Sequence, residues 1–210
     1  IDQDTIQRPS VTYMPGSGRS LHAAGQAPAD TQSIGIFHIP TLGNESDFGD
    51  LLAAIESPAG MSSRTRAIYS GGDNPNTDVI ASIEMQSTGN CADFGNLTEA
   101  RRDSGGASNS TRGLTAAGYD GSSVNIIEYV TIGTTGNATD FGDLTAARYG
   151  VGAGTNNTRA IMAGGDTGSM SNVTDYVTIA STGDAADFGD QILAARQRTP
   201  CTDSHGGLQG

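Results

Sequence analysis

Asp-Phe-Gly is the first candidate for chemistry in this sequence, because the Asp of this tripeptide holds a metal ion in protein kinases. The tripeptide occurs four times, beginning at Asp47, Asp93, Asp140 and Asp187. A kinase uses it once, beside a catalytic loop and a lysine, and this chain contains no lysine. The recurrence predicts a structural role, in which the aromatic rings pack between repeated units and the carboxylates cap turns or pair with repeated arginines. The rings are those of Phe48, Phe94, Phe141 and Phe188.

Other residues with metal-binding or nucleophilic side chains lack the spacing of a catalytic site. The loop 73–78 resembles a calcium loop only in its first residues, because the bidentate Glu that should follow is missing. No Gly-x-Ser-x-Gly elbow is present. The three histidines, which fall at unrelated positions of the repeat described below, are His22, His38 and His205. We therefore expect no catalytic residue, no metal and no cofactor, and a protein that is not an enzyme.

Three sets of residues recur with one period near 47, which indicates a tandem repeat. The Asp residues of Asp-Phe-Gly are 46, 47 and 47 residues apart. A second set, spaced 47, 46 and 47, consists of Arg19, Arg66, Arg112 and Arg159. A third set, which Ile55 interrupts once, consists of Arg8, Arg101, Arg148 and Arg196. We expect the Asp and Arg sets to form a ring of buried or half-buried contacts.

Each unit shows the alternation of apolar and polar residues that is typical of half-buried strands. In the last unit Val177 and Ile179 flank a threonine, and the other units repeat this pattern. The strand that begins at each second-set arginine carries a large residue, a small residue and then glycine on one face, as in Ile161, Ala163 and Gly165. This taper favours an inner strand that approaches a crowded central axis, where only small side chains fit.

Helical periodicity does not persist over a useful length of the chain. The one helix-like patch, residues 50–55, aligns with residues 143–148 of a later unit, so we interpret it as strand and turn. Loops rich in Asp, Asn, Gly and Ser, such as residues 73–78 and 166–172, separate the strands. The sequence therefore predicts an all-β protein with four short strands per unit.

The repeat resembles the kelch family, whose blades carry a Gly pair, a Tyr in the next strand, an outer aromatic residue and a small-residue-Arg ending. The last full unit shows these features as Gly164-Gly165, Tyr176, Phe188 and Ala195-Arg196. The resemblance implies a β-propeller, for which roughly 40–50 residues per four-stranded blade is usual. Two units depart from the Gly pair, with Ala24-Gly25 and Ala117-Gly118 in its place.

We expect residues 1–210 to form a single propeller domain with a 47-residue repeat. The expected units are, approximately, residues 8–54, 55–100, 101–147 and 148–195. The ends, residues 1–7 and 196–210, could close a four-bladed propeller as extra strands or combine into an incomplete fifth blade. In a third arrangement the chain is part of a longer repeat array, and its first residue, Ile1 rather than Met, suggests a processed product or such a part.

Composition narrows the classes of partner. The formal net charge of −12 disfavours nucleic acid, because an acidic surface repels phosphate. No apolar run approaches ~18 residues, so no transmembrane helix is expected. Cys91 and Cys201 either form one disulfide or remain free thiols. Asn-x-Ser/Thr tripeptides begin at Asn44, Asn96, Asn109, Asn137, Asn156 and Asn172. They could carry glycans in a eukaryotic secretory protein, but the abundance of Asn, Ser and Thr favours chance occurrence.

A second resemblance lies in the detailed residues of the repeat. Residues 135–148 and 175–189 look like kelch-like repeat proteins of tailed bacteriophages of aquatic bacteria. Those proteins are mostly virion components, such as tail fibres, tail tips or surface decorations. The resemblance implies a structural or adhesive module on a virion or another extracellular assembly, which binds partner subunits or a host glycan through its loops. Homo-oligomerisation is expected, because virion parts assemble symmetrically.

The alternative hypothesis is a free lectin-like propeller. Such a protein would need an equivalent aromatic pocket in each unit, whereas Tyr69, Tyr119 and Tyr149 do not recur at equivalent positions. The sequence therefore leaves the ligand-binding residues unknown, and it favours the structural module over the lectin.

Overall fold

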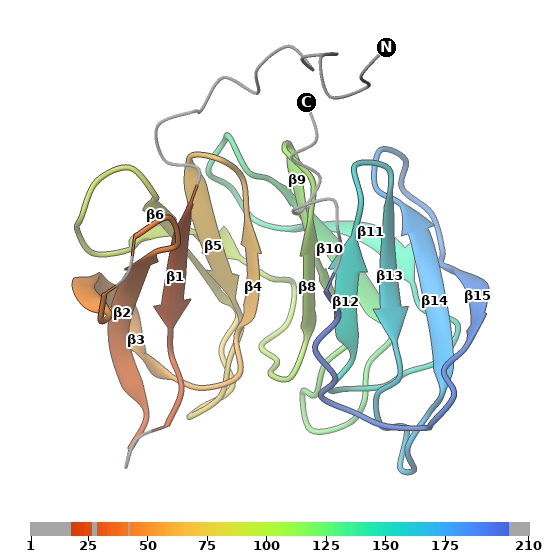
Figure 1. Cartoon of the computed structure of the whole chain (residues 1–210). Coiled ribbons are helices and arrows are strands. Elements are labelled where there is room, and N and C mark those ends of the chain that lie inside the picture. Colours follow the sequence, from red (N-terminus) through yellow and green to blue (C-terminus); the bar gives the residue numbers. More distant parts are fainter. Residues whose placement is uncertain (1–17, 27–28, 42, 202–210) are drawn as a thin grey trace, which may run out of the picture.

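The computed structural model describes residues 18–26, 29–41 and 43–201, and its regular structure consists of fifteen β-strands in four antiparallel sheets (Figure 1). Sheet 1 contains β1 (Arg19–Ala23), β2 (Thr31–His38) and β3 (Ser46–Ile55). Sheet 2 contains β4 (Ala59–Ser62), β5 (Arg66–Ser70), β6 (Val79–Glu84) and β7 (Ala92–Asn96). Sheet 3 contains β8 (Gly105–Ser108), β9 (Arg112–Ala116), β10 (Ile126–Thr131) and β11 (Thr139–Asp143). Sheet 4 contains β12 (Gly152–Thr155), β13 (Arg159–Ala163), β14 (Val173–Thr178) and β15 (Ala186–Asp190).

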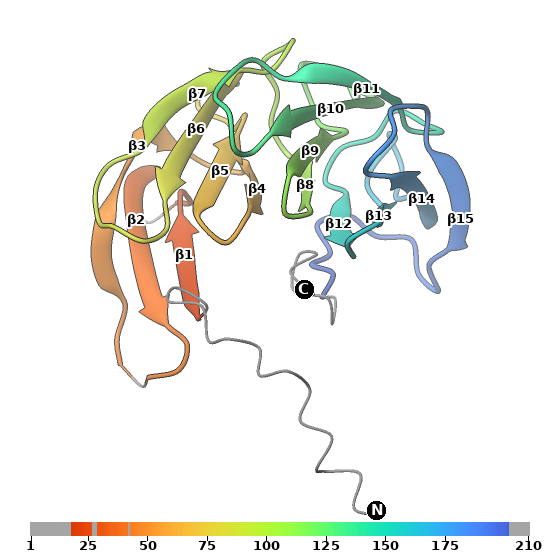
Figure 2. The same cartoon turned by 90° about the horizontal axis from the view of Figure 1, so that it is seen from above.

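The four sheets fan out as an arc with β4, β8 and β12 on its concave side (Figure 2). Strands in each sheet pair in sequence order, so that every sheet is a simple meander. The arc formed by the described residues stays open between sheet 1 and sheet 4 (Figure 2). Residues 50–55 extend β3, while residues 144–148 follow β11 as a turn, and the prediction of strand and turn is thereby confirmed.

The expectation that the arginine-led strands lie next to the axis is wrong for three of the four sheets, whereas in sheet 1 the arginine-led β1 is the first of the described strands. Strands β5, β9 and β13 are second in their sheets, and the short strands β4, β8 and β12 lie nearest the axis. Neighbouring inner strands approach so closely that a Cβ on Gly106 would lie 2.2 Å from the carbonyl oxygen of Gly60. The demand for small side chains near the axis is therefore real, but it applies to the Gly-, Ala- and Ser-rich strands that open each unit.

Neighbouring sheets meet at three junctions, each with its own apolar core. We call the contact between sheets 1 and 2 the first junction, and the contacts of sheet 3 with sheets 2 and 4 the later junctions. The Phe of Asp-Phe-Gly is buried in each, as Phe48 in the first junction and Phe94 and Phe141 in the later ones. Each ring packs against apolar residues of the following sheet, such as Val177 and Ile179 around Phe141.

A repeated backbone contact also joins the sheets, and we call it the junction contact. At the third junction the N–H groups of Gly183 and Ala185 donate to the carbonyl oxygens of Phe141 and Asp143, at 2.7 and 2.8 Å. The earlier junctions repeat it, with Gly136 and Ala138 donating to Phe94 and Asn96, and Gly89 and Cys91 donating to Phe48 and Asp50. The Gly of Asp-Phe-Gly makes this approach feasible, because a Cβ on Gly142 would lie 2.5 Å from the Gly183 backbone.

The predicted ring of Asp–Arg contacts is wrong. The carboxylates of Asp47, Asp93, Asp140 and Asp187 are exposed, and no ion pair within the described residues joins one of them to an arginine. Three of the second-set arginines instead reach the next sheet, each at the same repeat position. Arg66 donates to the carbonyl oxygen of Ile132 at 2.9 Å, and Arg112 donates to that of Ile179 at 2.8 Å. Arg19 makes the same contact with Met85. Arg159 stacks on the Tyr176 ring of its own sheet, with its Cζ 4.9 Å from the ring centroid.

Candidate functional site

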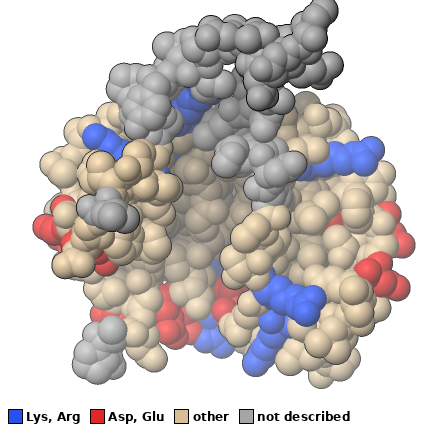
Figure 3. All heavy atoms as spheres, viewed as in Figure 1, with Lys and Arg blue, Asp and Glu red and all other residues tan. Residues whose placement is uncertain are grey.

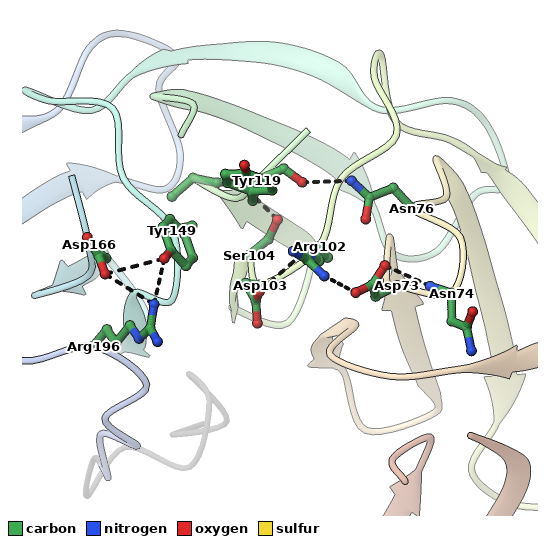
Figure 4. Close-up of polar contacts among 11 residues, drawn as sticks. Asp73, Asn74, Asn76, Arg102, Asp103, Ser104, Tyr119, Tyr149, Asp166 and Arg196 are labelled. Carbon is green, nitrogen blue, oxygen red and sulfur yellow. Dashed lines mark hydrogen bonds and ion pairs between the residues drawn. The ribbon is translucent and has the colours of Figure 1, made fainter. Parts of the chain in front are cut away.

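A row of polar and aromatic side chains lies where the loops after β5, β9 and β13 meet the turns that enter the inner strands (Figure 4). We call it the ridge and define it by Asp73, Arg102, Tyr119, Tyr149, Asp166 and Arg196. Isolated β-bridges place these residues, pairing Arg102 with Tyr119 and Tyr149 with Asp166. The ridge is thus built from two repeat positions, one on each side of a bridge, in successive units.

Contacts along the ridge alternate between ion pairs and rings. The Arg102 guanidinium bonds the carboxylate of Asp73, and its Nε lies 3.7 Å from the Asp103 carboxylate. The guanidinium also stacks over Tyr119, at 5.2 Å from the ring centroid. Bonding to Asp73 raises the pKa of Arg102 above its ordinary value, so that this cation is firmly charged. Asn76 donates to the Tyr119 carbonyl oxygen at 3.1 Å, which ties the loop of sheet 2 to that of sheet 3.

The middle of the ridge is an edge-to-face pair of rings. Tyr119 and Tyr149 have centroids 5.3 Å apart and an interplanar angle of 64°. This geometry is a favourable aromatic arrangement, because the positive edge of one ring meets the negative face of the other. Both residues are only partly buried, so that the pair forms part of the surface.

The far end of the ridge repeats the ion pair. Arg196 lies 3.1 Å from the Asp166 carboxylate and donates to the Tyr149 hydroxyl at 2.5 Å, and its guanidinium lies 5.4 Å from the Tyr149 ring centroid. The Tyr149 hydroxyl lies 3.3 Å from the same carboxylate. The two arginines remain about a third exposed, at 36% for Arg102 and 37% for Arg196.

Buried ion pairs beneath the ridge hold the turns that carry it. The side chains of Arg101 and Glu128 are fully buried, with Nη2 and Oε2 2.5 Å apart, and Glu128 also accepts from the Thr98 N–H at 2.8 Å. Arg148 and Asp175 repeat the pair at 2.9 Å, and Asp175 accepts from the Thr145 N–H at 3.0 Å. Burial lowers the pKa of both guanidinium groups, and the partner carboxylate opposes that shift. Because Arg102 and Tyr149 directly follow these arginines, the buried pairs fix where the ridge side chains emerge.

The ridge can recognise a ligand through three kinds of group. Its tyrosine rings offer apolar faces and edges, its guanidinium groups offer paired donors, and its carboxylates offer acceptors. Basic and acidic side chains also gather along the lower part of the face shown in Figure 3. A ligand with both an apolar face and several hydroxyl or carboxyl groups would match this set.

The structure shows that Arg196, the last member of the third arginine set, lies one repeat position after the others. Gly72, Gly118 and Gly165 donate to the carbonyl oxygens of Arg101, Arg148 and Ala195, so that Ala195 occupies the position of the buried arginines. Arg196 therefore corresponds to Arg102 and Tyr149, one residue later. Arg8, the first member, lies outside the described residues.

The other candidates from the sequence either belong to the ridge or lie apart from it. Asp73 of the calcium-like loop binds Arg102, and its Oδ1 accepts from the Asn74 N–H at 2.8 Å. Within residues 18–26, 29–41 and 43–201, no group of three or more His, Cys, Asp or Glu side chains could hold a metal ion. Cys91 is buried, Cys201 is exposed and both are free thiols, while His205 lies outside the described part of the chain. No helix in that part is long and apolar enough to span a membrane.

Sequence reasoning missed the ridge because it looked for an equivalent aromatic pocket in each unit and discounted tyrosines that do not recur at equivalent positions. Tyr119 follows the glycine after β9, whereas Tyr149 follows a buried arginine, so the two rings belong to different positions of adjacent units. The usable signal was the offset between these positions, since Arg102 and Asp73 are separated by 29 residues and Tyr149 and Tyr119 by 30.

The comparisons add no family to this description. A search against models of known protein families gives no match, and neither does a search of curated protein sequences.

Proposed function

We propose that the chain is a non-enzymatic structural or adhesive module of a virion or another extracellular assembly, that its sheets belong to a kelch-like β-propeller, and that it binds through the ridge. The observation that carries the proposal is the ridge itself, in which loops from three successive sheets present one aromatic pair between two ion pairs. The proposed partners are protein subunits of the same assembly or a glycan on a host surface.

The arrangement of the ridge suits recognition. Each arginine is already bonded to a carboxylate, and these pairs hold the rings in one geometry before any ligand arrives. A preorganised surface loses less conformational entropy on binding, which favours adhesion by rigid contact. The buried pairs Arg101–Glu128 and Arg148–Asp175 extend this rigidity into the core.

The alternative function is a free lectin-like domain, and the tyrosine pair is the observation that favours it. Tyrosine combines a large apolar ring with a hydroxyl, a combination suited to sugars, whose faces are apolar and whose edges are polar. The ridge differs from the expected lectin in offering one composite site across units, where a pocket in every unit was expected.

Two measurements test the proposal. An antibody against the chain, applied to intact particles or cells of the source and imaged by electron microscopy, should label the outside of an assembled structure; labelling confined to the soluble interior fraction would contradict it. A glycan array on the isolated domain should separate the module from the lectin. Binding of a sugar in every unit favours the lectin, whereas one glycan bound at the ridge, or none, fits the module. Tyr119→Ala and Tyr149→Ala should then abolish whatever binding is found, while the control Tyr129→Phe, at the Arg112 end of its sheet, should retain it.

A further inference from the structure

The two ends of the arc expose complementary halves of the junction contact. At the sheet 4 end, β15 carries the fourth Asp-Phe-Gly, but Phe188 is 57% exposed, and a Cβ on Gly189 would meet nothing within 4 Å. The equivalent Phe141 is 2% exposed, and Gly142 touches the Gly183 backbone. The apolar side chains of Ile192 and Leu193 lie exposed just beyond β15. This end therefore has the half of a junction that supplies the Phe ring and the carbonyl acceptors, without its counterpart.

The sheet 1 end has the receiving half, which supplies the N–H donors and the apolar surface for the Phe ring. Residues 43–45, Gly-Asn-Glu, correspond by the repeat spacing to Gly89-Asn90-Cys91. At the first junction the N–H groups of Gly89 and Cys91 donate to carbonyl oxygens of β3. Ile39 corresponds to Ile132 and Ile179, which are 1% and 0% exposed, whereas Ile39 is 70% exposed. No hydrogen bond among the described residues joins β15 to residues 43–45, and the two ends face the opening of the arc (Figure 2).

We propose that the β15 end of one copy docks on the residue 39–45 end of a second copy, repeating the internal junction contact between molecules. The contact would use the Phe188 and Asp190 carbonyl oxygens as acceptors for the N–H groups of residues 43 and 45, and Phe188 would pack against Ile39. The argument for a second copy is continuity: the chain makes this contact three times internally, and each copy carries both missing halves. The inference goes beyond the proposed function, because it concerns the ends of the array and leaves the ridge free.

The symmetry of this contact sets its outcome. The two surfaces differ, so the interface is heterologous, and association propagates past a dimer unless a ring closes. Both surfaces are acidic, with Asp187 and Asp190 on one side and Glu45 and Asp47 on the other. Like charges across the interface oppose association at low ionic strength, and added salt screens them. Oligomers should therefore grow with protein concentration and with salt.

The test uses one variant for each end. Phe188→Glu places a charge on the β15 end, and Ile39→Glu places one on the receiving end; both residues are exposed, so folding is retained. By light scattering after size exclusion, the parent should give a series of masses that rises with concentration. Each variant alone should be a monomer, and an equimolar mixture should give a dimer only, because each variant keeps the end that the other has lost.

Controls separate this inference from the proposed function. Met170→Glu changes an exposed apolar residue in the β13–β14 loop and should associate as the parent does. Tyr119→Ala should also associate as the parent does, since the ridge takes no part. A parent that stays monomeric at every concentration and salt level, a series unchanged in both Glu variants, or a mixture that stays monomeric each overturns the head-to-tail contact.

Discussion

The first junction and the two later junctions share the junction contact but differ inside. In the later junctions a buried arginine meets an acidic residue of the following sheet, as Arg101 meets Glu128 and Arg148 meets Asp175. In the first junction Ile55 and Ala81 occupy these positions, so an apolar pair replaces the ion pair. The repeat therefore changes both partners together, and it never leaves a buried charge alone.

The difference extends to the backbone next to the pair. Glu128 and Asp175 accept from the N–H groups of Thr98 and Thr145, and there the outer strand has already ended. Ala81 offers no such acceptor, and β3 continues to Ile55. A hollow of about 380 Å³, lined mainly by apolar groups, remains beside Ile55 in the first junction. The acid thus does two things at once, since it neutralises the arginine and accepts from the backbone just beyond the end of the outer strand.

The largest effect should come from breaking an ion pair in a later junction. Glu128→Ala leaves the Arg101 guanidinium buried without its carboxylate, and the expected loss of unfolding free energy is about 3–5 kcal/mol. Urea denaturation measures it. Glu84→Ala is the matched control, because Glu84 pairs with Arg66 at the surface and should contribute less than about 1 kcal/mol. Equal losses in the two variants would mean that the buried pair is not what distinguishes the later junctions.

A second experiment asks whether the first junction depends on the shared backbone contact. A Cβ on Gly49 would lie 1.8 Å from the Gly89 carbonyl oxygen, whereas one on Gly189 meets nothing, and both residues have positive φ. Gly189→Ala should cost only the backbone strain, about 1–3 kcal/mol. Gly49→Ala should cost about 1–3 kcal/mol more, because the next sheet must move. The same urea denaturation applies, and equal costs would show that the close approach is easily relieved.

Part of this architecture follows from the sequence alone. The period near 47, the alternation around Val177 and the turn residues of the loops predict the strands and their number in each complete unit. The order of strands within a sheet does not follow, because alternation shows which residues share a face and leaves open which strand lies nearest the axis. The place nearest the axis was therefore assigned to the arginine-led strand, which is second in sheets 2, 3 and 4.

The buried pairs could also have been predicted from their spacing in the sequence, but the Asp-Phe-Gly series forms a more regular pattern. Arg101 and Glu128 are 27 residues apart, as are Arg148 and Asp175, and Ile55 and Ala81 keep nearly that offset with both charges gone. The Asp of Asp-Phe-Gly recurs without change and so attracted the prediction of pairing. This Asp is exposed in every unit, whereas the residues that do pair vary together between units.

A smaller effect is expected when the ion pair of a later junction is replaced by the apolar pair of the first junction. Arg101→Ile combined with Glu128→Ala removes both charges, and the double variant should be more stable than Glu128→Ala by about 2 kcal/mol. Recovery should be incomplete, because the Thr98 N–H loses its acceptor. Urea denaturation of the parent, both single variants and the double variant gives the coupling energy. A double variant no more stable than Glu128→Ala would show that the apolar pair works only in its native junction.

The smallest effect concerns Cys91, which stands in the first junction where the later junctions have Ala138 and Ala185. Burial raises the pKa of its thiol to about 11. The unfolded thiol ionises from its ordinary value of 9.0 upward, so this contribution to stability is complete below pH 9 and is lost as the pH rises toward 11. Across that window the parent should lose about 1 kcal/mol per pH unit more than Cys91→Ala.

Burial of Tyr69 also raises its pKa, but that shift is present in both proteins and largely cancels in the comparison. Unfolding curves at intervals from about pH 8 to 11 measure the difference. Parallel pH profiles would mean that the thiol reaches solvent in the folded protein, and the first junction would then be looser than the later ones.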